Sequence, residues 1–206
     1  HCQVKVELPK KDGVGTIWKL FLVLLILDAS TSLLFAHVQD SESNEETFEG
    51  IRKFMDQCQC KPKNCCADMA FSGTEFDKFY THHGINPLPT GPRTPWPNRA
   101  ESAVRLFKWQ VRIAVKMIFN DPTVIKPKMR EIVRYCVWAR NNSFTVSGYT
   151  PIELVFGRRP PDLLDAENLK PDQLTTPKLA QDIRADVLRK HALQAHIQAR
   201  QHDDLL

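Results

Sequence analysis

The stretch TPWPNRAESAVRLFK, residues 94–108, sets a proline-rich approach against the start of a helix. From Asn98 onward the apolar residues recur at helical spacing, and the pattern holds to about Phe119. Asn98 is a good N-cap, and Glu101, three residues later, completes a capping box that favours a helix start. The alternative to this structural role is that the Glu101 carboxylate binds a metal ion.

One face of the expected helix carries an acid followed by three bases. Glu101, Arg105, Lys108 and Arg112 recur at intervals of four, three and four residues, so they form one stripe. A pair such as Glu101 and Arg105 contributes only about 0.2–0.5 kcal/mol, so helix stability alone is a weak reason for the stripe. A solvated helix face is one interpretation. The other is a helix that binds phosphates through its bases and a divalent cation through its acid.

Length and composition fit one domain with an appended tail. The 206 residues are 42% hydrophobic and 25% charged, with a net charge of +4, which is compatible with nucleic-acid binding without requiring it. The most apolar run, residues 20–27, has eight residues, whereas a membrane span needs about 20. A buried strand is therefore favoured over a signal or anchor segment. Because the chain begins at His1, we expect it to be a fragment of a longer polypeptide.

Periodicity predicts an α/β fold with a mixed sheet and helices on both faces. The expected strands lie near residues 4–8, 20–27, 33–38 and 64–67, and the first three are expected to form an antiparallel meander. The expected helices lie near residues 43–58, 74–82, 98–119 and 128–140, with a short one closed by Gly157 and a last one after Pro177. Residues 84–98 hold five prolines and are expected to form a stiff, irregular loop. The last helix is expected to be a packing arm or a weak coiled coil.

Three further features carry alternative interpretations. Four of the six cysteines fall in CQCKPKNCC, residues 58–66, which lacks the paired C-x-x-C spacing of structural zinc sites. Reduced thiols near a strand are favoured there over a metal site or a disulfide framework. His82 and His83 have no acid or nucleophile paired with them by motif, so we interpret them as surface residues. Trp96 either packs against its own domain, as is more frequent, or stacks on a base or sugar.

The motifs CCADMAFSGTEF (residues 65–76), PTGPRTPWPNRAESAVRLFK (89–108) and GYTPIELVFGRRP (148–160) together resemble the catalytic core of retroelement integrases, in the form found in retrotransposon polyproteins. The resemblance covers about residues 3–160. It implies a ribonuclease H-like fold, with a mixed five-stranded sheet flanked by helices. Residues 161–206 are then expected to form a linker and a charged C-terminal helical extension.

The resemblance also implies a site in which three acids, written as Asp, Asp and Glu, hold two Mg²⁺ or Mn²⁺ ions. Asp68 matches the second acid and Glu101 the third, and a helix cap there would fix where the carboxylate lies. Glu7, on the first strand with 60 residues between it and Asp68, matches the first acid, with Asp12 and Asp28 as alternatives. Glu7 is one methylene longer than Asp, which displaces the carboxylate by more than the roughly 0.5 Å that catalytic ligands tolerate, so the substitution is expected to impair activity.

The activity implied by the resemblance is phosphoryl transfer on DNA: 3′-end trimming with water as nucleophile, then strand transfer into target DNA. The family's DNA-contacting bases fall on Arg105 and Lys108, and Asn98 and Arg112 complete the expected DNA-binding set. Members of the family act as multimers, so we expect a homo-oligomer that works on DNA in the nucleus, without a membrane. The alternatives are a decayed integrase core that binds nucleic acid or protein without cutting, and a structural segment of a polyprotein.

Overall fold

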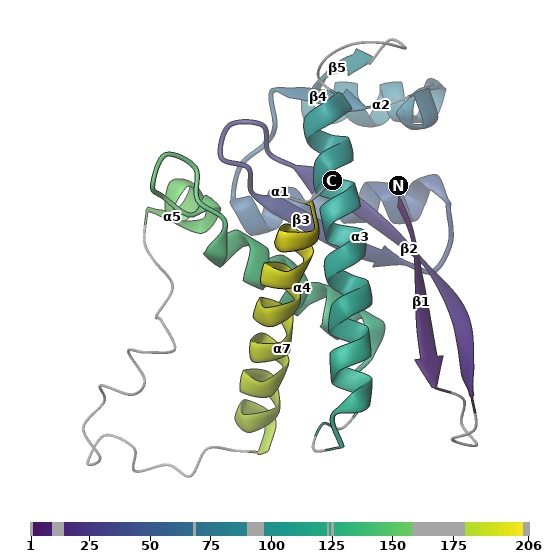
Figure 1. Cartoon of the computed structure of the whole chain (residues 1–206). Helices are drawn as coiled ribbons and strands as arrows, with labels where there is room; N and C mark the ends of the chain where they lie inside the picture. The colour runs from purple at the N-terminus through teal and green to yellow at the C-terminus, as the bar shows by residue number, and fades with distance from the viewer. Residues whose placement is uncertain are drawn as a thin grey trace.

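The structure, a computed structural model, describes residues 2–9, 15–67, 69–89, 97–122, 124, 126–157 and 180–203 (Figure 1). Helices lie on both sides of a small sheet, which confirms the predicted α/β class. The elements follow in the order β1 (Cys2–Pro9), β2 (Thr16–Leu27), β3 (Leu34–Gln39), α1 (Asn44–Cys58), β4 (Asn64–Ala67), the 3₁₀ turn η1 (Met69–Phe71), α2 (Thr74–His83), β5 (Asn86–Pro89), α3 (Pro97–Asn120), α4 (Met129–Ser143), α5 (Pro151–Phe156) and α7 (Ala180–Asp203).

The strands divide into two sheets. β1, β2 and β3 form the predicted antiparallel meander, whereas β4 and β5 pair with each other in parallel. The predicted single sheet of five strands is therefore not confirmed among the described residues. β4 and β5 have only four residues each, and β5 contains Pro87 and Pro89, which have no backbone N–H to donate. Such short, proline-containing strands supply few of the hydrogen bonds that would join them to a larger sheet.

β1 and β2 form a long hairpin of which only one part is buried. Val4 and Val6 of β1 are buried while Lys5 and Glu7 between them are exposed, which is the predicted period of two. β2 starts at Thr16, earlier than predicted, and its first five residues are all exposed. The expectation that the whole apolar run of residues 20–27 is buried is wrong at its start, because that end of β2 belongs to the projecting hairpin arm, residues 7–9 and 16–20 (Figure 1).

Two hydrophobic cores pack against the meander. The first joins β1 and β2 to α3, α4 and α7, and its fully buried members include Val4, Val6, Val23, Phe107, Val111, Ile118, Ile132 and Leu188. The second joins β2 and β3 to α1 and α2 through Leu24, Leu33, Ile51, Phe54, Phe76, Phe79 and Tyr80. Gly50 lets α1 approach the sheet closely, since a Cβ there would lie 2.7 Å from the Leu24 Cδ2 atom. α7 packs on α3 and α4, as a packing arm would.

The helix ends show which caps the sequence specified. Ser43 accepts a hydrogen bond from the Glu46 N–H at 3.3 Å at the start of α1, as predicted. α3 begins at Pro97, so Asn98 lies inside its first turn, and the prediction of Asn98 as the N-cap is wrong. Proline is favoured at the first helical position, because its fixed φ suits a helix and its missing N–H would have no partner there. Two elements, β5 and the start of α3, thus lie in the predicted irregular loop.

Within the described residues, no helix is both long enough and apolar enough to cross a membrane.

Candidate nucleic-acid interface

α3 crosses the molecule from the end near β4 and β5 to the end near the hairpin arm (Figure 1). Phe107 and Val111 lie on its buried side. Glu101, Arg105 and Arg112 are exposed, and Lys108 is half-buried. The predicted stripe therefore exists as one outward side of the helix. It also continues for one more turn, because the exposed Lys116 follows Arg112 by four residues.

The first base of the stripe, Arg105, contacts the last turn of α7. The Arg105 Nε atom lies 2.9 Å from the Asp203 Oδ1 atom, in an ion pair whose Arg105 side chain remains 55% exposed. One turn further on, the Trp109 ring stacks on the His202 ring with centroids 4.4 Å apart. The C-terminal helix thus borders the stripe, and Arg105 keeps an exposed guanidinium beside an acid.

β1 and α3 are held in a definite register. Burial raises the pKa of the Cys2 thiol, and Lys108 lies close enough for its positive charge to act in the opposite direction. Further along, the Arg112 Nε atom donates a hydrogen bond to the Lys5 carbonyl oxygen at 3.1 Å. Later residues of β1 therefore lie beside later turns of α3.

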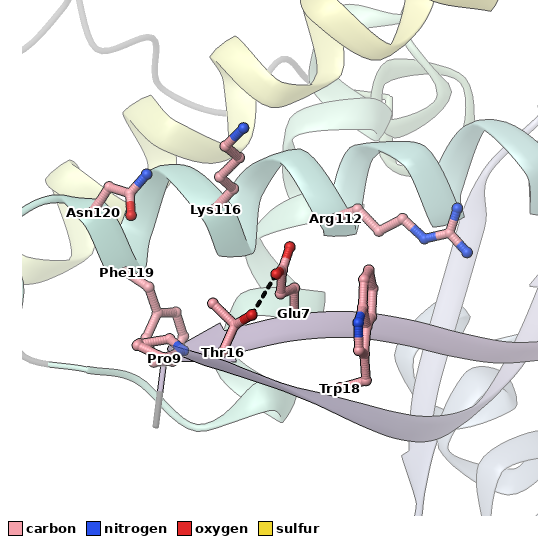
Figure 2. A pocket seen from close by; sticks show the side chains of 8 residues that line it. All are labelled: Glu7, Pro9, Thr16, Trp18, Arg112, Lys116, Phe119 and Asn120. Carbon is pink, nitrogen blue, oxygen red and sulfur yellow. Dashed lines mark hydrogen bonds between the residues drawn. The ribbon is translucent and has the colours of Figure 1, made fainter. Parts of the chain in front are cut away.

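This register places Glu7 beside the last turns of α3. Its Oε1 atom accepts a hydrogen bond from the Thr16 hydroxyl at 2.6 Å. Figure 2 shows Glu7 in an open groove of about 280 Å³, which is lined by Glu7, Pro9, Thr16, Trp18, Arg112, Lys116, Phe119 and Asn120. Arg112 comes 11 residues after Glu101, about 16 Å along a helix. The structure therefore does not bring Glu7 and Glu101 together.

The other predicted acids are placed differently. Asp68 lies outside the described residues, between the end of β4 at Ala67 and the start of η1 at Met69, so its neighbours agree with the predicted strand end. Asp12 also lies outside them. Asp28 follows β2, where burial would raise its pKa, but hydrogen bonds from Thr31 and Ser30 outweigh burial and lower it. The turn after β2 thus satisfies the Asp28 carboxylate.

Comparison with known proteins identifies the fold. No family model and no curated protein matches the sequence. Among solved structures, the catalytic core domain of BIV integrase matches with a TM-score of 0.55 and 12% identity, over 75% of this chain and 93% of that chain. The HTLV-2 integrase catalytic core in complex with magnesium, in its trimeric form, matches with a TM-score of 0.54 and 15% identity, over 74% and 93%.

The chain has the fold of a retroviral integrase catalytic core. A third structure, the simian T-cell lymphotropic virus intasome in complex with the PP2A regulatory subunit B56 gamma, has a TM-score of 0.55 and 16% identity over 85% of this chain. This chain spans only 59% of the matched intasome chain. The integrase-core resemblance of the three sequence motifs is confirmed at the level of the fold.

The integrase fold raises the question of a metal site, and the described residues do not form one. No group of three His, Cys, Asp or Glu side chains that could hold a metal ion occurs in the part of the chain that the structure describes. Glu7 accepts a hydrogen bond from Thr16 and lies far from Glu101. Asp68, the central acid of the predicted set, lies outside the described residues, so the three-acid site stays a prediction. Among the described acids, Glu7 and Glu101 do not come together, and no reaction step through a metal follows from them.

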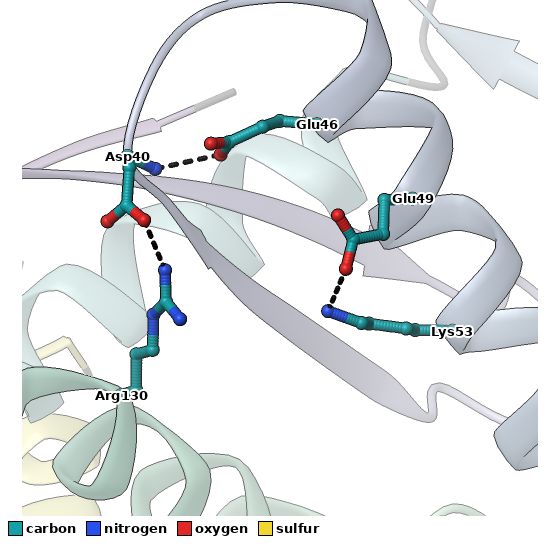
Figure 3. Close-up of polar contacts among 5 residues, drawn as sticks. All are labelled: Asp40, Glu46, Glu49, Lys53 and Arg130. Atoms are coloured by element: carbon teal, nitrogen blue, oxygen red, sulfur yellow. Dashed lines mark hydrogen bonds and ion pairs between the residues drawn. The ribbon is translucent and has the colours of Figure 1, made fainter.

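A second group of acids is already engaged by bases. Figure 3 shows Asp40 paired with Arg130 at 2.6 Å and Glu49 paired with Lys53 at 2.5 Å. Glu46 accepts a hydrogen bond from the Asp40 N–H at 2.8 Å. These contacts join α1, the end of β3 and α4, so this group holds elements together and does not resemble an open ligand site.

The cysteine cluster and the two histidines show no sign of catalytic activation. Burial first, and then neighbouring Cys60 and Asp28, raise the pKa of Cys58 to about 11, so its thiol stays protonated at neutral pH. A metal-binding cysteine needs the opposite shift. His82 is exposed, as predicted, whereas His83 is half-buried with its ring centroid 4.5 Å from that of Phe79.

Sequence reasoning missed part of this interface. Lys116 extends the stripe at the same four-residue interval, so the pattern itself contained that signal. Trp18 was assigned to no element, yet it is 57% exposed and lines the groove. Only the pairing of β1 with β2, which sets Trp18 opposite Glu7, brings it to this position.

Proposed function

We propose that this chain is an integrase-type core that binds DNA along the exposed side of α3. The observation that carries the proposal is the row of Arg105, Lys108, Arg112 and Lys116 on one side of a helix, in a chain with the fold of an integrase core. Lysine and arginine bind DNA mainly by neutralising phosphates and releasing condensed counterions. Successive bases on one helix side suit that sequence-independent contact.

The length of the row matches a short stretch of DNA backbone. From Arg105 to Lys116 the helix rises about 16 Å, which is close to the rise of five base pairs. Arg105 and Arg112 present planar guanidinium groups suited to two-point phosphate contacts, while Lys108 and Lys116 act as point charges. Asn98 lies in the first turn of the same helix, so we include it among the proposed DNA contacts.

The finer proposal is metal-dependent 3′-end trimming and strand transfer into target DNA. It assigns Asp68 and Glu101 as ligands of Mg²⁺ or Mn²⁺. Supporting it are the strand-end position of Asp68 in the sequence, the exposed Glu101 one turn before Arg105, and the magnesium in the HTLV-2 core. The place of Glu7 beside Arg112 argues against its role as the first acid of this set.

The second candidate function is DNA binding without cutting, by an integrase-derived core that has lost its first acid. The specific observation in its favour is again Glu7, whose carboxylate faces Thr16 and the last turns of α3 rather than Glu101. The row of bases serves both candidate functions equally, so a cutting assay has to distinguish them.

We further propose a homo-oligomer that acts in the nucleus and derives from a retrotransposon polyprotein. The dimeric and trimeric forms of the HTLV-2 core support the oligomer, and DNA as the substrate supports the nuclear location.

The DNA-binding proposal is tested by the affinity of the full chain for duplex DNA across a range of salt concentrations. Replacing Lys108 or Arg112 by alanine should weaken binding uniformly across DNA sequences and reduce the salt slope by about one. Lys78→Ala is the matched control, because Lys78 is an exposed lysine on a different helix, α2. Equal slopes for wild type, Lys108→Ala and Lys78→Ala would contradict the proposal.

The cutting proposal is tested with Mg²⁺ and Mn²⁺ on a branched DNA substrate, comparing wild type with Glu101→Gln and Glu7→Asp. Activity that disappears in Glu101→Gln and is unchanged in Glu7→Asp is the expected result. Activity that appears only in Glu7→Asp would return Glu7 to the catalytic set. Inactivity of all three proteins, with DNA binding intact, would support the binding-only function.

A further inference from the structure

We infer that the groove beside the last turns of α3 binds an unpaired nucleotide of single-stranded DNA and prefers a base with an exocyclic amino group. The groove is the one lined by Glu7, Pro9, Thr16, Trp18, Arg112, Lys116, Phe119 and Asn120 (Figure 2). The inference rests on the proposed DNA binding for its ligand, but it concerns a separate position, about 16 Å along α3 from Glu101.

Trp18 supplies a surface on which a base can stack. Its side chain is 57% exposed, and one face of its ring is covered by the Lys5 Nζ atom, 5.0 Å from the ring centroid. In Figure 2 the ring stands at one end of the groove, with Phe119 and Pro9 at the other end. Base–aromatic stacking tolerates any base, because every base has a π-face. Trp18 therefore explains binding to a base but not the choice of base.

Glu7 supplies that choice. It pairs with Trp18 across the hairpin, so both side chains lie on the same face of the two strands. Thr16 donates to its Oε1 atom, and Oε2 has no partner among the described residues. A carboxylate accepts a hydrogen bond from the amino group of cytosine but repels a phosphate. Glu7 therefore selects a base edge that can donate, and thymine has no exocyclic amino group.

Arg112 and Lys116 supply the contacts for the flanking phosphates. They lie on successive turns of α3, above Glu7 and Trp18 in Figure 2. The Arg112 Nε atom is used by the Lys5 carbonyl oxygen, which orients the guanidinium and leaves its terminal nitrogens for a ligand. Lys116 is exposed and has no carboxylate partner in the described part of the chain. Two bases next to one acid leave the groove with net positive charge.

The size and openness of the groove favour one unit of a longer chain. Its volume of about 280 Å³ lies just below the roughly 300–1,000 Å³ of pockets that enclose small molecules. A nucleotide whose backbone continues past α3 uses the open side, whereas a free cofactor would be left largely exposed. The charged lining also disfavours an apolar peptide.

The test measures binding of labelled oligo(dC) and oligo(dT) to the full chain by fluorescence anisotropy, with EDTA present and above pH 7. Oligo(dC) should bind more tightly than oligo(dT). Trp18→Ala should weaken oligo(dC) binding about tenfold, from the loss of one stacked base. Ile17→Ala is the matched control, because Ile17 is 54% exposed on the neighbouring position of the same strand and does not line the groove. Glu7→Ala should abolish the difference between the two oligonucleotides.

Three results would overturn the inference. The first is that the wild type binds oligo(dC) and oligo(dT) equally. The second is that Trp18→Ala and Ile17→Ala bind oligo(dC) with equal affinity. The third is that the protein self-associates through Trp18 in the absence of DNA. The duplex measurements distinguish this failure from failure of the proposed function. If Lys108→Ala loses duplex binding while Trp18→Ala leaves oligo(dC) binding unchanged, only the inference about the groove is refuted. If Trp18→Ala weakens oligo(dC) binding while Lys108→Ala leaves duplex binding unchanged, the groove is supported and the proposed duplex binding by the row on α3 is refuted.

Discussion

Acidification is predicted to destabilise the protein through one buried imidazole of α7. His196 is 2% exposed, and neither ring nitrogen has a hydrogen-bond partner among the described residues. Its pKa is lowered from 6.5 to about 4, first by burial and then by the positive charges of Arg140 on α4 and Arg200 on α7. Both guanidinium groups lie 5.3 Å from the Phe144 ring centroid, so the cluster carries positive charge next to an aromatic face.

The sign of the effect follows from proton binding. Above pH 6.5 the imidazole is neutral in the folded and the unfolded chain. Between pH 6.5 and about 4 the unfolded chain binds a proton that the folded chain does not, so stability falls as the pH falls through this window. One pKa unit corresponds to about 1.4 kcal/mol, so the loss across the window is about 3 kcal/mol.

The assay is urea unfolding at pH 7 and pH 4.5 for the wild type and for His196→Leu, which cannot take up the proton. Other groups also titrate in this range, so the informative quantity is the difference between the two proteins in their loss of unfolding free energy. The wild type should lose about 2–3 kcal/mol more than His196→Leu. Equal losses in wild type and His196→Leu would refute the reasoning.

Three further predictions concern packing and the DNA face. Asp203→Ala should tighten duplex DNA binding by up to about fivefold, since an exposed ion pair such as Arg105 with Asp203 is worth only about 0.2–1 kcal/mol, and anisotropy titration measures this. Gly50→Ala should lower the unfolding free energy by about 1–3 kcal/mol, although alanine favours helices, because its Cβ would press on the buried Leu24; urea unfolding tests this. Phe107→Ala should lower the unfolding free energy by about 3–5 kcal/mol in the same assay, because the Phe107 side chain is fully buried on the inner side of α3.

Local signals in the sequence were sufficient for most elements. α1 begins where Ser43 can cap it, and α5 lies between the Thr150 capping box and a left-handed Gly157, so the start of α1 and both ends of α5 are specified by residues close in sequence. The antiparallel meander was also predictable, because its three apolar stretches are joined by short links. In these cases the deciding interactions span only a few residues.

The position of Glu7 depends on contacts between distant residues. The spacing between Glu7 and Asp68 suits the first acid of the predicted three-acid site. Spacing along the chain, however, does not determine which residues of β1 lie beside which turns of α3. That register is set where Val4 and Val6 pack against Phe107 and Val111 in one core. Once these side chains interlock, Glu7 lies beside the last turns of α3, and no pattern within β1 alone predicts this outcome.

The stripe on α3 likewise shows that a sequence pattern does not determine the surroundings of each side chain. Its four-residue spacing correctly predicted one exposed helix side, yet tertiary packing gives its two ends different chemistry. At the first end Arg105 faces Asp203 of α7, so an acid competes there with any phosphate. At the other end Arg112 and Lys116 border the groove with Glu7 and Trp18, where a base has a surface to stack on and an acceptor to bind. Equal charge along a helix therefore does not mean equal function: alanine at Arg105 should weaken duplex binding alone, whereas alanine at Arg112 should weaken both duplex and single-strand binding.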